Sequence, residues 1–295
     1  MTRYEPNVDV DAIDAIDMHV HIEVDEHGHG SLPDDLTEAA SAYFAADAGR
    51  PDLDSIADYY RERRMAAVVF TVDAEHRLQH PPISSETIAA GAARHNDVLI
   101  PFGSVDPGRI DAIDRVRRLA EDYGVRGFKF HPTLQGFDPS DEAHQPLYAV
   151  LEELGLIALF HTGQTGIGAG LPGGRGLRLA FSNPMLLDGV AADFPRLQII
   201  MAHPSVPWQD EAISVATHKH NTWIDLSGWS PKYFPESLVR AANSFLRERV
   251  LFGSDFPLLT PDRWQRDAAA ANTFKPEVLP SVLKKNAARL LRINE

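Results

Sequence analysis

The chain has 295 residues, of which 44% are hydrophobic and 24% are charged, a composition typical of folded globular proteins. Its formal net charge of −14 opposes binding to nucleic-acid phosphates and to anionic membrane surfaces. The lack of cysteine excludes disulfides, thiolate zinc sites and cysteine nucleophiles. We therefore expect a small-molecule substrate, no nucleic-acid or membrane partner, and a metal site, if present, built from histidine and carboxylate.

The N-terminal stretch MTRYEPNVDVDAID is acidic and lacks an apolar core, and no run of about 18 apolar residues follows it. These features predict neither export nor membrane insertion, so we expect a cytoplasmic protein. No linker or internal repeat divides the sequence, and we expect one domain over residues 1–295. Barrel enzymes in general suggest a homo-oligomer, with a dimer as the expected form.

Eight short apolar runs recur along the chain, and most are continuously apolar, as is typical of parallel strands buried on both faces. They span residues 13–19, 67–72, 98–105, 125–130, 157–161, 197–202, 222–226 and 250–253. Helix-like segments separate them at residues 84–95, 109–123, 141–154, 184–193, 209–219 and 235–246, and a closing helix is expected over 276–291. This alternation predicts an α/β fold, a single (β/α)8 TIM barrel.

Two connections exceed the usual loop length, which is typical of lids and binding elements. Residues 22–66, after the first strand, contain two expected helices around 37–48 and 53–64, and so form an extended helical insertion. Residues 163–183 are rich in glycine and carry Arg175 and Arg178.

Polar side chains gather at the predicted strand ends, which in a parallel barrel all face the same side and build the active site. His19 and His21 are two residues apart, so an extended strand turns both rings toward the same side. His161, His203 and Asp255 follow three further strands. Together these residues predict a metal site, and their imidazole and carboxylate groups suit Zn²⁺, with Mn²⁺, Fe²⁺ or Co²⁺ as alternatives.

The ordered motifs DMHVH, FHTG, AHP and GSDFP resemble the amidohydrolase superfamily, and within it the amidohydrolase-2 group that includes aminocarboxymuconate-semialdehyde decarboxylase and resorcylate decarboxylases. The resemblance implies that His19, His21, His161 and Asp255 bind the metal. It also implies that His203 is the general acid/base, and that Asp255 can handle a proton as well. The resemblance spans the whole expected barrel.

Lys129, at the end of the fourth predicted strand, leaves two alternatives open. In binuclear amidohydrolases this lysine is carboxylated and bridges two metals, whereas the decarboxylase-like group is mononuclear, and we favour one ion. Without carboxylation Lys129 would hold an anionic group of the substrate or pair with Asp255. The neighbouring His131 would contact the substrate or support the residues that do.

The runs GFKFHPTLQGFDP and LFHTGQTGIGAGLPGGRG are similar to 4-hydroxyphenyl-β-ketoacyl-CoA hydrolases. This similarity implies hydrolysis of an aryl β-ketoacyl thioester in aromatic compound degradation, by a metal-activated water. Our leading expectation is thus a metal-dependent hydrolase of a carbonyl-bearing, anionic small molecule. The alternatives are a nonoxidative decarboxylase of an aromatic or ring-cleavage acid and, from another class, a non-catalytic metal- or ligand-binding barrel.

Substrate anions require cations, and we expect Arg175, Arg178 and Lys129 to supply them. Trp208 and Trp229 follow the sixth and seventh predicted strands and, with Tyr233, are candidates for an aromatic wall of the substrate site.

Overall fold

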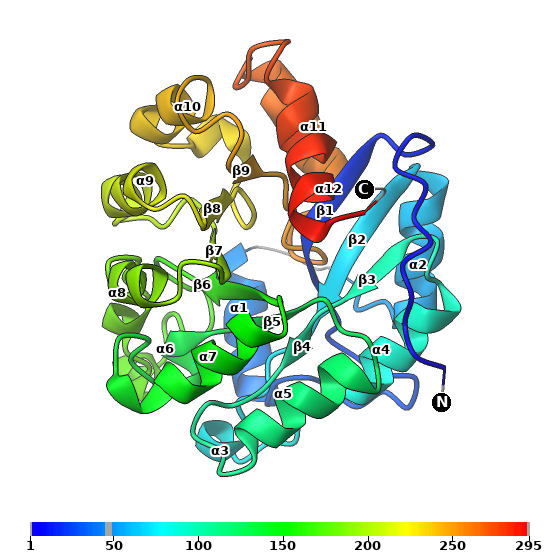
Figure 1. Ribbon diagram of the computed structural model, residues 1–295, viewed down its shortest axis with the longest axis vertical. Helices are drawn as coiled ribbons and strands as arrows, with labels where there is room; N and C mark the ends of the chain where they lie inside the picture. Colours follow the sequence, from blue (N-terminus) through cyan, green and yellow to red (C-terminus); the bar gives the residue numbers. More distant parts are fainter. Residues whose placement is uncertain (1, 45–48, 294–295) are drawn as a thin grey trace.

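Parallel β-strands form the centre of the computed structural model, which describes residues 2–44 and 49–293 (Figure 1). Neighbours along the chain are neighbours in the sheets, with β1 to β3 in one and β4 to β9 in the other. The strands are β1 (Ala15–His21), β2 (Met65–Phe70), β3 (Leu99–Pro101), β4 (Gly103–Ser104), β5 (Gly127–Phe130), β6 (Ile157–His161), β7 (Gln198–Ala202), β8 (Thr222–Asp225) and β9 (Val250–Leu251).

Backbone hydrogen bonds join the two sheets into one closed barrel. Phe102 separates β3 from β4, and its N–H still donates to Val69 O of β2 at 3.0 Å, so β3 and β4 are halves of one barrel strand. Between β9 and β1, Met18 N donates to Phe252 O at 3.0 Å, and Val20 bridges to Phe256. The ring therefore has eight strand positions, and the predicted (β/α)8 barrel is confirmed.

The helices surround this ring (Figure 1). Their apolar positions recur at three- and four-residue spacing, as in α5, which buries Ala112, Val116 and Leu119. The α-helices are α1 (Asp34–Phe44), α2 (Leu53–Glu62), α3 (Glu75–Leu78), α4 (Ser85–Arg94), α5 (Ala112–Glu121), α6 (Pro132–Gln135), α7 (Gln145–Glu153), α8 (Leu186–Asp193), α9 (Gln209–His218), α10 (Glu236–Ala242), α11 (Pro261–Ala270) and α12 (Asn286–Leu291).

The two helices expected between the first and second strands are present, but they have different places in the fold. The first is α1, of which the expected residues 45–48 lie outside the described part of the chain. The second is α2, which begins after the N-cap Asp52 and buries Ile56 and Tyr60 against the barrel strands. Only α1 is thus an addition to the barrel, since α2 is its first outer helix.

Three helices were not expected from the sequence: α3, α6 and α11. The first two are only four residues long. α11 buries only Pro261, Trp264 and Ala268, because the rest of PDRWQRDAAA is polar or alanine, and its apolar stripe is correspondingly thin.

The first strand also begins and ends two residues later than expected, at Ala15 and His21. None of the described helices is both long and apolar enough to cross a membrane.

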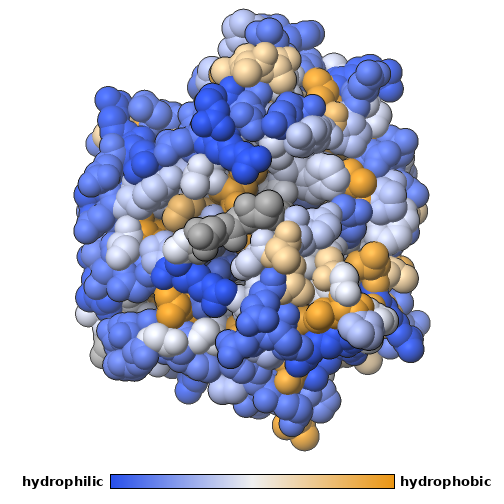
Figure 2. All heavy atoms as spheres, turned by 180° about the vertical axis from the view of Figure 1, so that it is seen from behind, coloured by the Kyte–Doolittle hydropathy of each residue, from blue (hydrophilic) through white to orange (hydrophobic). Residues whose placement is uncertain are grey.

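Alternation along the strands determines which side chains enter the barrel. On β6, Ile157 and Leu159 belong to the interior apolar cluster, and His161 continues the same face. On β8, Trp223 belongs to the same cluster, and Asp225 continues its face at the end of the strand. The interior is therefore apolar at one end and polar at the carboxyl ends of the strands. Figure 2 shows the molecule from behind, where hydrophilic residues cover most of the surface and hydrophobic residues form small separate groups.

Candidate active site

A cavity of about 260 Å³ opens at the carboxyl ends of the strands. Its inner part is lined by the polar strand-end residues His21, Lys129, His131, His161, His203 and Asp255. The outer part is formed by α1, by residues 164–167 of the glycine-rich loop, and by the segment that leads into α11. Binding sites for drug-sized molecules are commonly about 300–1,000 Å³, so this cavity suits a smaller compound.

A β-bulge turns His19 toward this cavity. The pairing of β1 with β2 shifts register between Asp17 and Val20, and such bulges re-aim side chains next to active sites. Ile16 and Met18 face the barrel interior. The shift brings His19 to the same side, with its ring centroid 5.1 Å from that of His21. The two rings therefore converge, as the sequence predicts.

Asp225 at the end of β8 fixes the protonation pattern of the His19 ring. Its Oδ2 lies 2.5 Å from His19 Nδ1. Lys129 Nζ donates to His19 Nε2 at 3.0 Å on the other side of the ring. Because one nitrogen faces a carboxylate and the other accepts from an ammonium group, Nδ1 carries the proton and Nε2 presents its lone pair.

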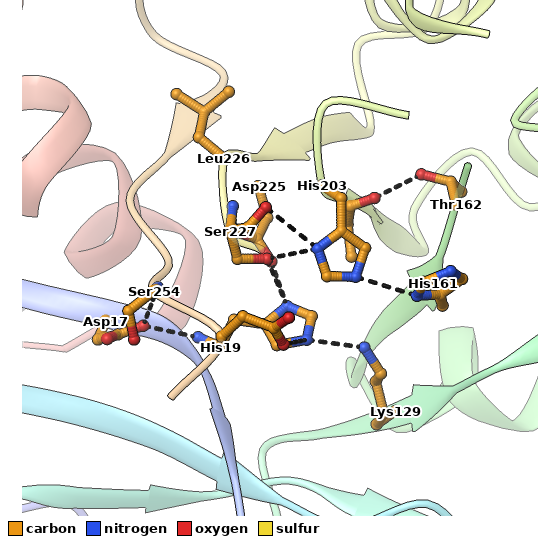
Figure 3. Close-up of polar contacts among 12 residues, drawn as sticks. Asp17, His19, Lys129, His161, Thr162, His203, Asp225, Leu226, Ser227 and Ser254 are labelled. Carbon is orange, nitrogen blue, oxygen red and sulfur yellow. Dashed lines mark hydrogen bonds and ion pairs between the residues drawn. The ribbon is translucent and has the colours of Figure 1, made fainter. Parts of the chain in front are cut away.

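A second chain of hydrogen bonds fixes the His161 ring in the same way (Figure 3). His203 Nδ1 lies 3.2 Å from the backbone oxygen of Ser227, which can only accept, and 2.9 Å from Ser227 Oγ, whose hydroxyl donates to Asp225 Oδ2 at 3.1 Å. Nδ1 therefore carries the proton. His203 Nε2 must then accept from His161 Nδ1, at 3.0 Å. The remaining nitrogen, His161 Nε2, is buried without a hydrogen-bond partner in the described structure. Its lone pair is thus available to a ligand that the protein does not supply.

These donors fit a divalent metal ion. Donor atoms of His19, His203 and Asp255 all lie within 4.8 Å of one another. Asp255 Oδ1 lies 3.3 Å from His19 Nε2 and 3.1 Å from His21 Nε2, so both rings of the HxH pair meet one carboxylate oxygen. The orphaned lone pair of His161 Nε2 and the carboxylate of Asp255 are the kinds of group that bind zinc, manganese or iron.

Burial keeps the imidazoles of His19, His161 and His203 neutral, as metal binding requires. It lowers the pKa of His19 and His161 well below the ordinary value, and the cation Lys129 adds to this effect at both rings. Burial likewise lowers the pKa of His203 to about 4. Burial raises the pKa of Asp255, but the hydrogen bond with His21 and the nearby His203 and Lys129 outweigh it, and the net pKa is below the ordinary value.

Lys129 is fully buried at the inner end of the cavity. Burial lowers its pKa to about 7, although Asp255 and Asp225 act in the opposite direction. The side chain reaches His19 rather than forming an ion pair with Asp255. An anionic group bound beside Lys129 would favour its charged form.

The backbone at two strand ends is held in an unusual conformation. His203 and Asp255 have positive φ values of 71° and 75°, which non-glycine residues adopt rarely and mostly at functional sites. Ile200 and Ala202 face the barrel interior, so strict alternation would turn His203 outward. Its left-handed conformation brings the ring back to the cavity. Gly228 leaves the necessary room, since a Cβ there would lie 2.7 Å from His203 Nδ1.

The structure places the predicted substrate residues in different environments. His131 and Trp229 line the cavity, as does Tyr233, and the His131 ring stacks on His161 with centroids 3.8 Å apart. Trp208 precedes α9 outside the cavity lining.

Arg175 and Arg178 are exposed and outside the lining as well. Both belong to the glycine-rich loop, in which residues 173–175 all have positive φ. Arg175 forms an ion pair with Asp35 of α1 at 2.6 Å instead.

Sequence reasoning missed four residues of the site: Asp17, Asp225, Ser227 and Arg263. Asp17 Oδ1 accepts from the backbone N–H of both His19 and Ser254, at 3.0 and 2.9 Å, and so joins the two segments that carry His19 and Asp255. Ser227 Oγ lies 3.0 Å from His19 Nδ1 and 2.9 Å from His203 Nδ1. The available signal for Asp225 and Ser227 was the pair of polar residues in the sequence DLS, at the end of the seventh apolar run.

A barrel that gathers histidines and an aspartate at its strand ends is the arrangement of a metal-dependent enzyme of the amidohydrolase type. Residues 16–293 match the family model described as Amidohydrolase, and the chain belongs to this family. A comparison with curated proteins finds no match.

Solved structures with the same fold include the uncharacterized TIM-barrel protein Bb4693 from Bordetella bronchiseptica, 23% identical, with a TM-score of 0.75 over 94% of this chain and 98% of that one. A dihydroxybenzoic acid decarboxylase from Polaromonas sp. JS666, with bound manganese and the inhibitor 2-nitroresorcinol, is 14% identical, with a TM-score of 0.66 over 96% and 98%. A probable 2-pyrone-4,6-dicarboxylic acid hydrolase from Acinetobacter baumannii, with bound citric acid, is 15% identical, with a TM-score of 0.64 over 95% and 100%.

Proposed function

We propose that this amidohydrolase is a metal-dependent, nonoxidative decarboxylase of a small aromatic or unsaturated carboxylic acid, and that residues 1–295 act as one catalytic domain. The observation that carries the proposal is the cavity, whose inner end combines the metal donors with the buried Lys129. Its volume of about 260 Å³ suits a single-ring acid better than an entire acyl-CoA thioester. The manganese-containing decarboxylase with the same fold supports this choice, which reverses the order of our two leading expectations.

We assign the metal to His19, His21, His161 and Asp255. The support is that His19 Nε2 and His161 Nε2 present lone pairs, while His21 and His19 share the same oxygen of Asp255. His203 is within reach too, and we assign it to proton transfer rather than to the metal. A bound divalent ion would polarise the carboxylate or an adjacent oxygen of the substrate, and zinc or manganese would serve.

The remaining side chains position the substrate and move one proton. Lys129 binds an anionic oxygen at the inner end of the cavity, and His131 contacts the ring beside it. Reaction breaks the bond between the substrate carbon and its carboxyl group and releases CO2, while a new C–H bond forms on that carbon. The proton comes from solvent water and reaches the carbon through His203, which is neutral in the free protein and takes up the proton before it donates it, with Asp255 beside it favouring the charged ring.

A second candidate is hydrolysis of a carbonyl compound in the same cavity. It is favoured by the neutral His203, which could accept a proton from an attacking water. The hydrolase from Acinetobacter baumannii has the same fold. Both candidates use the same residues and differ in the products.

Product analysis in isotopically labelled water separates the two reactions. Metal-loaded protein is screened with carboxylated phenols and with aryl β-ketoacyl thioesters in H2¹⁸O. The decarboxylase should release CO2 and leave a product without solvent ¹⁸O, and in D2O it should carry one deuterium at the former carboxyl position. A product that gains ¹⁸O without release of CO2 would refute decarboxylation and establish hydrolysis. The His203→Ala variant, if it keeps its metal and loses turnover, excludes a non-catalytic binding protein.

A further inference from the structure

The described lining of the cavity includes one arginine, Arg263, in place of the expected Arg175 and Arg178. It lies in the first turn of α11, and its side chain is 49% exposed, which places it at the outer rim. Lys129 is fully buried at the inner end. The cavity lining also includes the apolar side chains of Val72, Leu134, Trp229, Leu258 and Leu259.

The guanidinium group of Arg263 is poorly neutralised by the protein. Its nearest carboxylate among the described residues is Asp267, whose Oδ2 is 3.9 Å from Nε, too far for a hydrogen bond. That oxygen already accepts from Ser230 Oγ at 2.7 Å. The hydrogen bonds found in the described structure include none from the Arg263 side chain.

Other charged groups near the rim have closer partners. Arg175 contacts Asp35 at 2.6 Å, and Glu23, the acidic residue of the outer lining, lies 3.6 Å from Arg50, compared with 3.9 Å between Arg263 and Asp267. Arg263 is thus a cation with unused donors beside a small cavity, in a protein whose net charge is −14. A guanidinium in this setting is suited to bidentate recognition of a carboxylate or phosphate.

We propose that Arg263 is a specificity residue that binds a second anionic group of the substrate at the rim, while the first reacts at the inner end beside Lys129. The preferred substrate is then an acid with two anionic ends separated by an apolar body. The inference rests on the proposed function only for the identity of the anionic group that reacts. The second anion is either a carboxylate on the same ring or the phosphate of a thioester carrier that extends out of the cavity.

Binding measurements test this inference without turnover. Calorimetry with metal-loaded protein compares benzoate with isophthalate and terephthalate, which add a carboxylate to the same ring, and with benzoyl-CoA, in which an uncharged thioester replaces the carboxylate and the carrier adds phosphates. Wild-type protein should bind at least one of these three probes more tightly than benzoate. Arg263→Met should weaken that probe about tenfold or more, as expected for a lost charge-assisted hydrogen bond, and leave benzoate within about twofold. If Arg263→Met loses affinity only for the two phthalates, the second anion is a carboxylate on the ring. If it loses affinity only for benzoyl-CoA, the second anion is the phosphate.

Two variants serve as controls. Arg266→Met removes an arginine from the same helix that is 69% exposed and outside the cavity lining, and it should leave all affinities unchanged. Arg263→Lys keeps the charge and should retain part of the preference. The inference is overturned if wild-type protein binds all probes with the same affinity as benzoate, or binds none of them. It is also overturned if Arg263→Met reduces the affinity for benzoate as much as the affinity for the other probes. A preference that depends on Arg263, in a protein that releases no CO2, would uphold it and refute the decarboxylase.

Discussion

Asp225 of β8 and His19 of β1 meet at 2.5 Å, Oδ2 to Nδ1, although β9 lies between their strands. Both side chains are fully buried. This contact orients the imidazole and leaves Nε2 facing Lys129 and Asp255, the role that hydrogen-bonded carboxylates commonly have behind metal-binding histidines.

Replacement of Asp225 should therefore weaken metal binding. We expect Asp225→Ala to reduce the affinity for Zn²⁺ or Mn²⁺ by about 10- to 100-fold, and Asp225→Asn to reduce it less, because the amide oxygen can still accept from His19 Nδ1. Competition with a chromophoric chelator measures the affinity. Asp262→Asn, which changes an exposed carboxylate of α11, is the matched control and should behave as wild type. Equal affinities in all four proteins would show that Asp225 does not position His19.

Gly228 should be intolerant of a side chain. Its φ is +74°, and a Cβ would lie 2.7 Å from His203 Nδ1 and 3.1 Å from Asp255 Oδ2. Gly228→Ala should lower kcat by at least about tenfold by displacing His203, and should destabilise the fold by roughly 1–3 kcal/mol. Steady-state kinetics and chemical denaturation measure the two effects.

Gly189→Ala provides the comparison for this variant. Gly189 lies within α8, and a Cβ there would meet nothing within 4 Å. Alanine should stabilise that helix by up to about 1 kcal/mol and leave kcat unchanged. If Gly228→Ala has wild-type kcat, the position of His203 is less constrained than we infer.

Asp106 should make stability depend on pH. Burial raises its pKa, the carboxylate of Asp73 adds to the increase, and Oδ2 has no hydrogen-bond partner in the described structure. A pKa higher in the folded than in the unfolded state means that the ionised carboxyl costs stability at neutral pH, and that this cost disappears as pH falls below the unfolded value of about 4.

Asp106→Asn should accordingly raise the Tm at pH 7 by roughly 1–3 °C, because the amide can donate toward Asp73 and carries no charge. The difference from wild type should shrink toward pH 4, as measured by thermal denaturation across pH. A Tm gain that is constant with pH, or a loss at pH 7, would contradict this account of Asp106.

The fold, and the gathering of histidine and aspartate side chains at one end of the barrel, were largely predictable from the sequence, and the reasons are local. Apolar runs alternate with helical segments, and the two-residue spacing of His19 and His21 requires their rings to converge on an extended strand. His161 and Asp255 follow apolar runs directly, so the parallel topology brings them to the same end of the barrel.

Other parts of the site depend on contacts that the local pattern does not specify. Asp225 is a single acidic residue near the end of an apolar run, which is a weak signal, and only the closed barrel brings it to His19. Arg175 and Arg178 seemed suited to an anion because of their glycine-rich loop, but both are exposed outside the cavity lining, and Arg175 pairs with Asp35 of α1. Arg263 is on α11, whose polar sequence gave no helix signal.

The metal content of purified variants tests the central claim most directly. Elemental analysis of wild-type, His19→Ala and His203→Ala proteins, prepared with the same added metal, gives the number of ions per chain. We predict about one ion in wild type, almost none in His19→Ala, and close to the wild-type content in an inactive His203→Ala. Full occupancy in His19→Ala, or no divalent ion in the wild-type protein, would contradict the assignment of this site to a catalytic metal.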